Sequence, residues 1–198
     1  TPTTDRALVE RELGHVFGTA IRPTADGRPF VSLTESAAIR DGDRFTLDRV
    51  RARECAGLHP SQMQICLDHI QMVAGEHVVE SQERTAQSLR GLGDVIDRLG
   101  ALPGRKVMVL ISGGMVTSLT RSGESSSPLL TQVASRAAAA NVAVHVIHVD
   151  TGALDGIEAD RRQLSQTIVS DAGLLSSGLK DVAASTGGDL TTVMGDAS

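Results

Sequence analysis

Aromatic residues are almost missing from this chain of 198 residues, which has no Trp, no Tyr and only three Phe, at positions 17, 30 and 45. A core must therefore be built from Val, Leu, Ile and Ala, and aromatic platforms for stacking nucleobases or sugars are excluded. Long apolar runs are missing too, since no window offers the roughly 18 uninterrupted apolar residues of a membrane helix. We therefore expect a globular protein with no membrane span in this chain.

Charge of one sign is not concentrated anywhere along the chain. The formal net charge is −5, and the basic residues are scattered among acidic ones instead of forming a stripe, which argues against nucleic-acid binding. The opening stretch TPTTDRALVE has neither a basic region nor an apolar segment of the kind found in targeting peptides. The length suits one domain over residues 1–198.

Cysteine is scarce, with only Cys55 and Cys66, eleven positions apart. His59 and His69 are nearby in sequence, but two Cys and two His in this order match no zinc-binding pattern. The residues themselves leave two states open, namely two unpaired thiols or one disulfide.

The rest of the sequence alternates helical and strand-like patterns. The longest helical pattern begins at Pro60 and covers residues 60–99. An unbroken helix of this length would measure about 60 Å, so part of it is expected to project or to break, with Gly75, Gly91 and Gly93 as places for a bend. Its middle, residues 80–88, is polar on nearly every face, which suits a solvated segment or an arm resting on a partner. Shorter helices are predicted over residues 6–17, with Thr4 or Asp5 as the cap, and over residues 35–39, 45–55, 127–140 and 173–185.

Two apolar runs of strand length, KVMVLI at 106–111 and NVAVHVIHVD at 141–150, are separated by one predicted helix. This order predicts a parallel β-α-β unit covered on both faces, with residues 107–111 as its central strand and an edge strand at 189–193. In open α/β sheets, ligands bind outside the carboxyl ends of the strands. Those ends are Ser112-Gly113-Gly114 and Asp150-Thr151-Gly152.

The ordered segments LRGLGDVIDRLGALPGRKVMVLISGGM, LTQVASRAAAANVAVHVIHVD and LKDVAASTGGDL resemble the central and C-terminal part of a von Willebrand factor A (VWA) domain of the bacterial VWFA-related type. TPTTDRALVERELGHVFG resembles the segment after the third strand of that family, and VSLTESAAI with RARECAG resembles a connection that a subgroup carries. The resemblance implies a three-layer, doubly wound, mostly parallel sheet with a long helix before the central strand, in a chain that starts after the first three strands.

The resemblance also bears on the cysteines and the location. Export is frequent in this family, which favours a disulfide between Cys55 and Cys66 and an extracytoplasmic or secreted protein, with the cytoplasm as the alternative.

The family's sheet carries a metal-ion-dependent adhesion site, at which oxygen ligands hold Mg²⁺. This chain has no Asp-x-Ser-x-Ser loop after a strand, and Gly113 stands at the position of the last Asp ligand. Thr34 (or Ser32) and Ser112 are the weak candidates that remain, so no cofactor is expected unless upstream residues complete a Mg²⁺ site. The resemblance thus implies a non-catalytic module that binds another protein through a degenerate site, formed by Thr34, Ser112, Gly113, Gly114, Asp150 and Thr151.

Other interpretations remain open. The Ser112-Gly113-Gly114 loop suits a tight exit from a strand that needs positive φ, or an anion- or nucleotide-binding site in an α/β enzyme. The enzyme hypothesis lacks the expected motifs, because neither a phosphate-binding Gly-x-x-x-x-Gly-Lys-(Ser/Thr) nor a Gly-x-Ser-x-Gly elbow is present. A third hypothesis is an assembly subunit that docks through the long helix.

Some single residues also have an expected placement. His145 and His148 are expected on opposite faces of a strand, and Glu35 and Glu54 are expected in solvent or in ion pairs.

Overall fold

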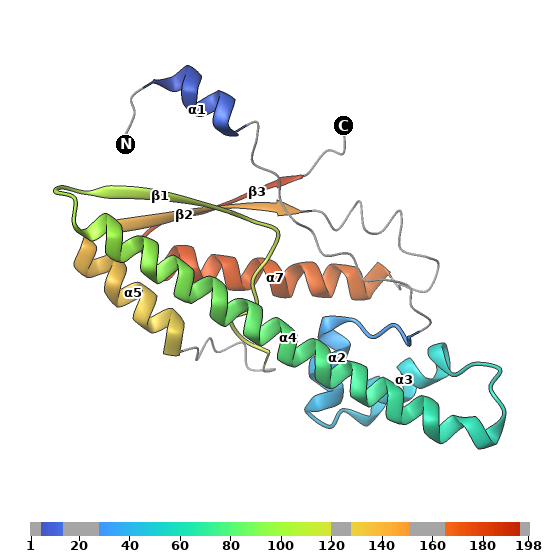
Figure 1. Ribbon diagram of the computed structural model, residues 1–198. Coiled ribbons are helices and arrows are strands. Elements are labelled where there is room, and N and C mark those ends of the chain that lie inside the picture. Colours follow the sequence, from blue (N-terminus) through green and yellow to red (C-terminus); the bar gives the residue numbers. More distant parts are fainter. Residues whose placement is uncertain (1–4, 14–27, 120–127, 151–164, 195–198) are drawn as a thin grey trace.

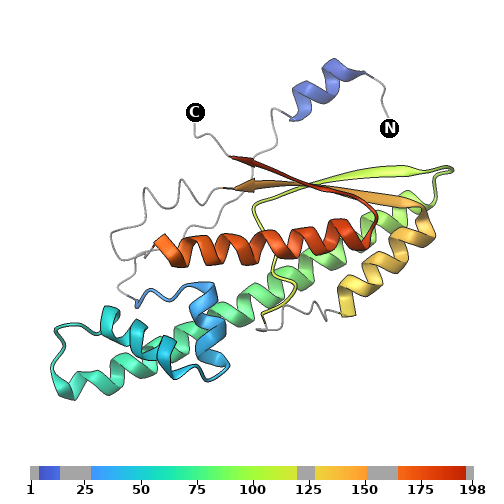
Figure 2. The same cartoon turned by 180° about the vertical axis from the view of Figure 1, so that it is seen from behind.

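The computed structural model describes residues 5–13, 28–119, 128–150 and 165–194. A small parallel sheet is covered on one side by three helices, and two further helices pack on the part of the longest helix that extends beyond the sheet (Figures 1 and 2). The helices are α1 (Arg6–Leu13), α2 (Leu33–Arg40), α3 (Arg44–Glu54), α4 (Pro60–Gly100), α5 (Pro128–Ala140) and α7 (Ser165–Ser185), and the strands are β1 (Lys106–Ser112), β2 (Val142–Asp150) and β3 (Leu190–Met194). The mixed α/β character and the parallel sheet are confirmed.

The three strands are arranged in the order β1-β2-β3. Strand β1 runs parallel to β2 from the pair Lys106 and Val142 to the pair Ser112 and His148, and β2 runs parallel to β3 from the pair Val146 and Leu190. In the described sheet β2 is therefore the middle strand and residues 107–111 form an edge strand, whereas a central position was predicted for them. The edge position of β3 is confirmed.

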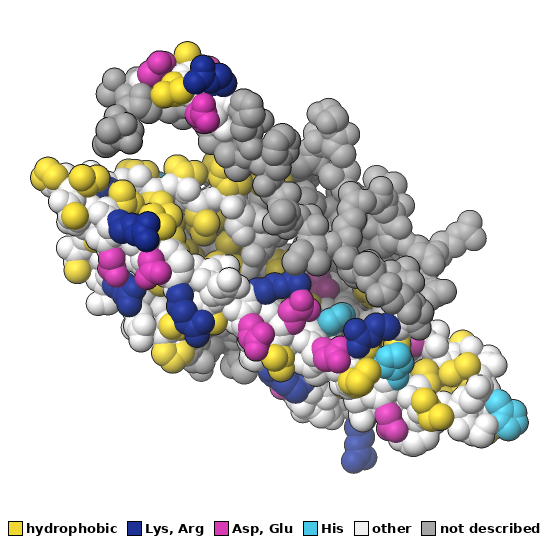
Figure 3. Space-filling view, viewed as in Figure 1, with side chains coloured by type: hydrophobic (Ala, Val, Ile, Leu, Met, Phe, Trp, Pro, Cys, Tyr) yellow, Lys and Arg dark blue, Asp and Glu magenta, His cyan; other side chains and the backbone are white. Residues whose placement is uncertain are grey.

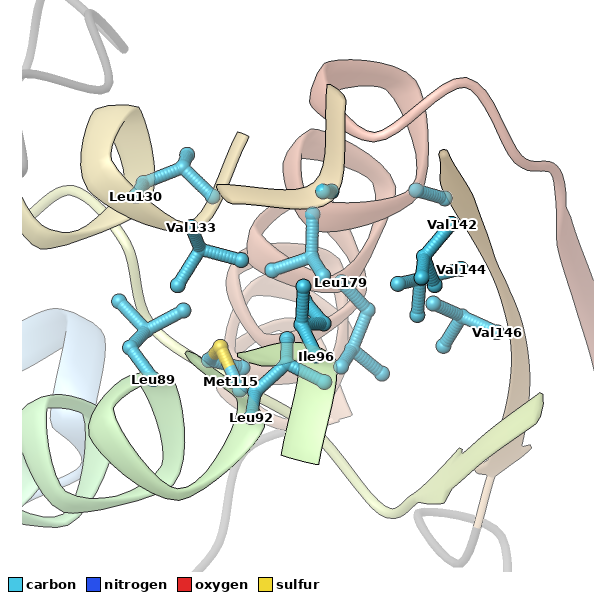
Figure 4. Close-up of a cluster of buried hydrophobic side chains, with 13 residues drawn as sticks. Leu89, Leu92, Ile96, Met115, Leu130, Val133, Val142, Val144, Val146 and Leu179 are labelled. Carbon is cyan, nitrogen blue, oxygen red and sulfur yellow. The ribbon is translucent and has the colours of Figure 1, made fainter. Parts of the chain in front are cut away.

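The main hydrophobic core lies between β2 and the three helices α4, α5 and α7 (Figure 4). Apolar residues of α4 at spacings of three and four and alternate residues of β2 point into the same space, as their two periodicities dictate. Full burial of each such side chain contributes roughly 1.5–3 kcal/mol to stability. The buried residues include Leu89, Leu92 and Ile96 of α4, Leu130, Val133 and Ala137 of α5, Leu179, Val182 and Ala183 of α7, and Val142, Val144 and Val146 of β2.

Helix α4 is continuous over 41 residues, so the glycines proposed as bends do not interrupt it. It does project beyond the sheet, and α2 and α3 cover this projecting part (Figure 1). A second apolar cluster forms there from Val31, Val50, Cys55, Ile70, Val73 and Ala74. The polar stretch 80–88 is only partly solvated, because Thr85 is buried and its hydroxyl accepts the N–H of Val116 at 3.3 Å.

The helix starts follow local signals in the sequence. Asp5 accepts hydrogen bonds from the N–H groups of Ala7 and Leu8 and so caps α1. Ser32 and Glu35 form a reciprocal capping box, so α2 begins at Leu33, two residues before the predicted start at Glu35. His59 caps α4, which has Pro60 in its first turn.

Cys55 is the C-cap of α3 and is joined by a disulfide to Cys66, the seventh residue of α4, with 6.1 Å between the two Cα atoms. Both cysteines of the chain are paired, so the free-thiol alternative does not apply to this structure. None of the described helices has the length and apolar character that crossing a bilayer requires.

Candidate functional site

A cleft of 390 Å³ opens beside the carboxyl end of β1, between α2, α4, α7 and the segment that follows β1. This is the edge at which open α/β sheets bind ligands. Six apolar residues line the cleft, namely Phe30, Val31, Leu33, Met115, Val116 and Leu175, and α4 contributes His77, Glu80, Ser81, Arg84, Thr85 and Ser88. The cleft therefore combines apolar lining residues with a wall of polar and charged side chains from α4, and Ser32, Gly114 and Asp171 complete its lining.

The guanidinium of Arg84 is the cationic group of that wall. It pairs with Glu80 one turn earlier, at 2.5 Å, and both side chains are about half exposed. Pairs of this kind on an exposed helix surface contribute only about 0.3–0.5 kcal/mol. Arg84 can therefore exchange Glu80 for a carboxylate of a bound molecule at little energetic cost.

The loop after β1 is held in place by its own hydrogen bonds. The Ser112 hydroxyl accepts the N–H of Gly114 and donates to the carbonyl of Gly114, both at 3.2 Å. The N–H of Met115 donates to the carbonyl of Leu175 in α7 at 3.1 Å. The N–H groups of residues 114, 115 and 116 are thus all used within the chain, and they do not form an anion cradle.

Glycine is required in this loop for conformational and steric reasons. Gly114 has φ of +153°, and a Cβ there would overlap the side chain of Leu175. Gly178 lets α7 approach equally closely, because a Cβ on it would meet the carbonyl of Met115. The interpretation of the loop as a strand exit that needs positive φ is confirmed at Gly114.

The carboxylate of Asp171, on α7, occupies the N-terminus of α2. It accepts the N–H groups of Leu33 at 3.0 Å and of Thr34 at 2.9 Å, and also a hydrogen bond from the Thr34 hydroxyl. Ser32 donates its hydroxyl to the same carboxylate at 3.4 Å. A negative charge at this position complements the partial positive charge of the helix start, and it fully engages Thr34.

A buried ionic network lies next to the cleft and fixes residue Phe30. Arg53 donates to both carboxylate oxygens of Glu35 at 2.9 and 3.0 Å, to Glu54 at 2.8 Å and to the carbonyl of Phe30 at 2.7 Å. The N–H of Phe30 donates in turn to Glu54 at 3.0 Å. Burial alone would lower the pKa of Arg53, but the hydrogen bonds to Glu35 and Glu54 outweigh it and raise the pKa above its ordinary value. Glu35 and Glu54 are thus ion-paired, and both are buried.

The predicted partner-binding residues are brought only partly together. Gly114 lines the cleft, Ser112 and Gly113 lead into it, and Thr34 follows the lining residue Leu33. Asp150 ends β2, one strand further along the sheet, and does not line the cleft. Thr151 lies outside the described residues.

The two histidines of β2 lie on opposite faces, as expected. His148 is 3% exposed, beside Ser112 in the sheet register, and its Nδ1 has no hydrogen-bond partner in the part of the chain that is described. His145 is partly exposed, and its Nδ1 accepts the N–H of Asp189 at 3.4 Å. The Ser112 hydroxyl bonds to Gly114, and among the described contacts no hydrogen bond joins it to His148.

Sequence reasoning missed Asp171, Arg53 and the α4 wall of the cleft. The S-x-x-E pattern at Ser32 and Glu35 is a capping-box signal that could have located the start of α2. No local pattern marks Asp171, because its partners are 137 to 139 positions away. The chain matches no protein-family model, and neither a curated protein nor a solved structure is detectably similar to it.

Proposed function

We propose that the chain is a non-catalytic protein-interaction module of the VWA type, which contacts its partner at the cleft beside the carboxyl end of β1. The observation that carries the proposal is the composition of the cleft, where apolar lining residues lie together with the half-exposed guanidinium of Arg84. An apolar side chain of a partner flanked by a carboxylate would satisfy both parts. The hydroxyl of Ser112 forms hydrogen bonds with the backbone of Gly114, which supports a non-catalytic role for Ser112.

The residues present do not fit the metal site that the family implies. Mg²⁺ requires oxygen ligands with negative charge, but Gly113 stands at the position of one carboxylate. Thr34 is engaged by Asp171, whose own oxygens already accept hydrogen bonds from the start of α2. In the described ranges, no three His, Cys, Asp or Glu side chains are grouped to hold a metal ion. The proposed module therefore binds through hydrogen bonds, shape and Arg84.

The disulfide supports an extracytoplasmic location, because such bonds persist in oxidising compartments. A cytoplasmic protein remains the alternative. Mapping of free thiols in the protein isolated from its native compartment distinguishes the extracytoplasmic location from the cytoplasmic one.

The cleft can be tested by filling it. A photo-crosslinking residue at Ser88, which lines the cleft, should capture a protein that the same residue at the neighbouring Gln87 does not. With that partner purified, Ser88→Trp should weaken binding at least about tenfold, which corresponds to 1.4 kcal/mol. The matched control Gln87→Trp should leave the affinity unchanged. Equal effects of both substitutions would rule out the cleft as the contact surface.

A simpler measurement tests the alternative hypothesis, an anion- or nucleotide-binding enzyme. Inorganic phosphate or a nucleoside triphosphate should not raise the melting temperature, because the N–H groups of residues 114–116 are already bonded. A rise that depends on ligand concentration would favour that alternative.

Docking through α4 is a second candidate, favoured by one specific feature of that helix. Ile65, Met72 and Val79 recur every seven residues and are 69, 49 and 53% exposed, which places them in one stripe along the helix. Deletion of part of α4 cannot test this, because the helix also supplies core residues. Replacing the three stripe residues by Ser should abolish partner binding if α4 is the docking surface, and should leave it unchanged if the cleft is.

A further inference from the structure

The disulfide between Cys55 and Cys66 ties the end of α3 to α4, in the part of the molecule that extends beyond the sheet. Among the eleven residues of α3, Thr46 and Val50 are buried and Leu47 is partly buried. The surface of this part carries charged side chains of both signs close together (Figure 3), and exposed charge pairs add little stability. Because a short helix with few packed side chains is marginal in water, the covalent bond supplies a tether that the packing of α3 does not.

The last two residues of α3 hold one wall of the cleft. Arg53 donates to the carbonyl of Phe30 at 2.7 Å, and Glu54 accepts the N–H of Phe30 at 3.0 Å. Arg53 also donates to both carboxylate oxygens of Glu35, which accepts the N–H of Ser32 at 3.2 Å. Phe30 and Ser32 both line the cleft. The position of this wall is therefore set by the two residues that directly precede the disulfide.

The other side of the cleft is held by α4 and α7. The N–H of Met115 donates to the carbonyl of Leu175 in α7 at 3.1 Å, and the N–H of Val116 donates to the hydroxyl of Thr85 in α4 at 3.3 Å. Both donors line the cleft, and they lie beside the main core between β2 and the helices α4, α5 and α7. Release of α3 therefore loosens one wall of the cleft and leaves the other in place.

We propose that oxidation of Cys55 and Cys66 shapes the cleft and so controls the binding of its partner; since the cleft is the proposed contact surface, this control rests on the proposed function. The oxidant is a disulfide compound. The thiolate of one cysteine attacks a sulfur of the oxidant and forms a mixed disulfide, and the thiolate of the other cysteine then displaces the oxidant. Two electrons and two protons pass to the oxidant, which leaves as two thiols. An exported chain meets such an oxidant in an oxidising compartment, so its contact surface forms there.

Amide hydrogen exchange tests the effect on the cleft without a partner. Reduction by a dithiol can break only this one bond, because the chain has no other cysteine. Exchange of the N–H groups of Phe30 and Ser32 should become at least about tenfold faster, whereas that of Met115 and Val116 should change less than about twofold. Unchanged exchange at Phe30 would overturn the proposal. Equal acceleration at Met115 would also overturn it, because the loss of structure would then not be confined to one wall.

Two further variants separate the disulfide from other effects of the reductant. The Cys55→Ser, Cys66→Ser double variant without reductant should show the same exchange as the reduced protein. Glu54→Gln keeps the disulfide but weakens the acceptor of the Phe30 N–H, so it should reproduce the faster exchange at that group. Asp48→Asn, at a side chain of the same helix that is 61% exposed, is the matched control and should leave the exchange unchanged. Equal exchange at Phe30 in the Glu54 and Asp48 variants would contradict the link from α3 to the cleft.

The affinity for the partner captured from position 88 completes the test. The reduced chain should bind that partner at least about tenfold more weakly than the oxidised chain, and reoxidation should restore the affinity. An affinity that does not change on reduction, in a chain where Ser88→Trp weakens binding, would overturn the redox control and leave the proposed function intact. If reduction accelerates exchange at Phe30 but Ser88→Trp does not weaken binding, the proposed function is wrong, although the disulfide still shapes the cleft.

Discussion

The carboxylate of Asp171 accepts hydrogen bonds from both the backbone N–H and the hydroxyl group of Thr34, 137 positions earlier in the chain. This contact fixes the start of α2 against α7, and Asp171 also lines the cleft. It joins the helical layer of the sheet to the part of the molecule built around α2 and α3.

Asp171→Asn should therefore destabilise the protein. The amide keeps the shape of the carboxylate but turns one acceptor into a donor that faces N–H groups, so we expect a loss of roughly 1.5–3 kcal/mol in the free energy of unfolding. Urea denaturation measures it. Asp94→Asn, at a side chain that is 71% exposed, should cost less than about 0.5 kcal/mol. Similar small losses in both variants would show that the Asp171 contact contributes little.

Removal of the Arg53 side chain should have a larger effect. Arg53→Met leaves the carboxylate of Glu35, which is 1% exposed, without its main partner, and breaking a buried pair in this way costs about 3–5 kcal/mol. Arg51→Met removes an exposed pair with Asp48 on the same helix and should cost at most about 1 kcal/mol. If Arg53→Met and Arg51→Met melted alike, the network around Glu35 would not be a stabilising feature.

Loss of the disulfide should destabilise the chain moderately. The bond closes a loop with a sequence separation of 11, for which the chain-entropy estimate is about 3 kcal/mol. Thermal melts with and without a reductant, and of the Cys55→Ser, Cys66→Ser double variant, measure this difference. Peptide mapping that recovers both residues as free thiols in the native protein would remove the prediction and the argument for an oxidising compartment.

Two Val→Asp substitutions distinguish the exposed face of the sheet from its core. Val109→Asp places a charge at a side chain that is 55% exposed, so the protein should still fold and melt cooperatively. Val144→Asp buries a charge at a fully buried position of β2, which costs several kcal/mol and should abolish soluble expression. Loss of folding in Val109→Asp would show that the face of β1 is covered in solution.

Divalent cations should not stabilise the protein. The melting temperature in about 5–10 mM Mg²⁺ or Mn²⁺ should equal that in EDTA, whereas occupancy at 100 times the dissociation constant would add about 2.7 kcal/mol. The reason is that Gly113 supplies no carboxylate and that Thr34 is bonded to Asp171. A rise of several degrees that disappears in Thr34→Ala would mean that a metal site exists at the start of α2.

Features encoded by neighbouring residues could be predicted from the sequence. The cap at Asp5, the start of α4 at Pro60 and the parallel order of the two apolar strands all follow from short patterns. The disulfide was expected from a family resemblance, and the geometry of Cys55 and Cys66 agrees with it. The three-layer architecture and the function were expected on the same basis and stay predictions.

Features that depend on distant residues could not be predicted. The stretch RARE of α3 is rich in charge, as a solvated helix face would be. Only the packing of α2 decides that the Arg53 side chain is 15% exposed while that of Arg51 is 44% exposed. The continuous apolar run of β1 is the same for an edge strand as for a central one, so its position depends on which strands pair with it. Asp171 has no local signal for the same reason, because its partners belong to another helix.

Helix α4 crosses two separate apolar clusters, one around Ile70, Val73 and Ala74 and one around Leu89, Leu92 and Ile96. Isolated helical segments are only marginally stable in water. The backbone hydrogen bonds in each half of α4 therefore stay closed only while the apolar cluster packed against that half stays intact. Amide hydrogen exchange along one unbroken helix should therefore be graded, with the slowest protons next to the sheet and the fastest near Pro60. The outer half of the helix can open while the inner half stays closed, so the two ends of α4 have different lifetimes.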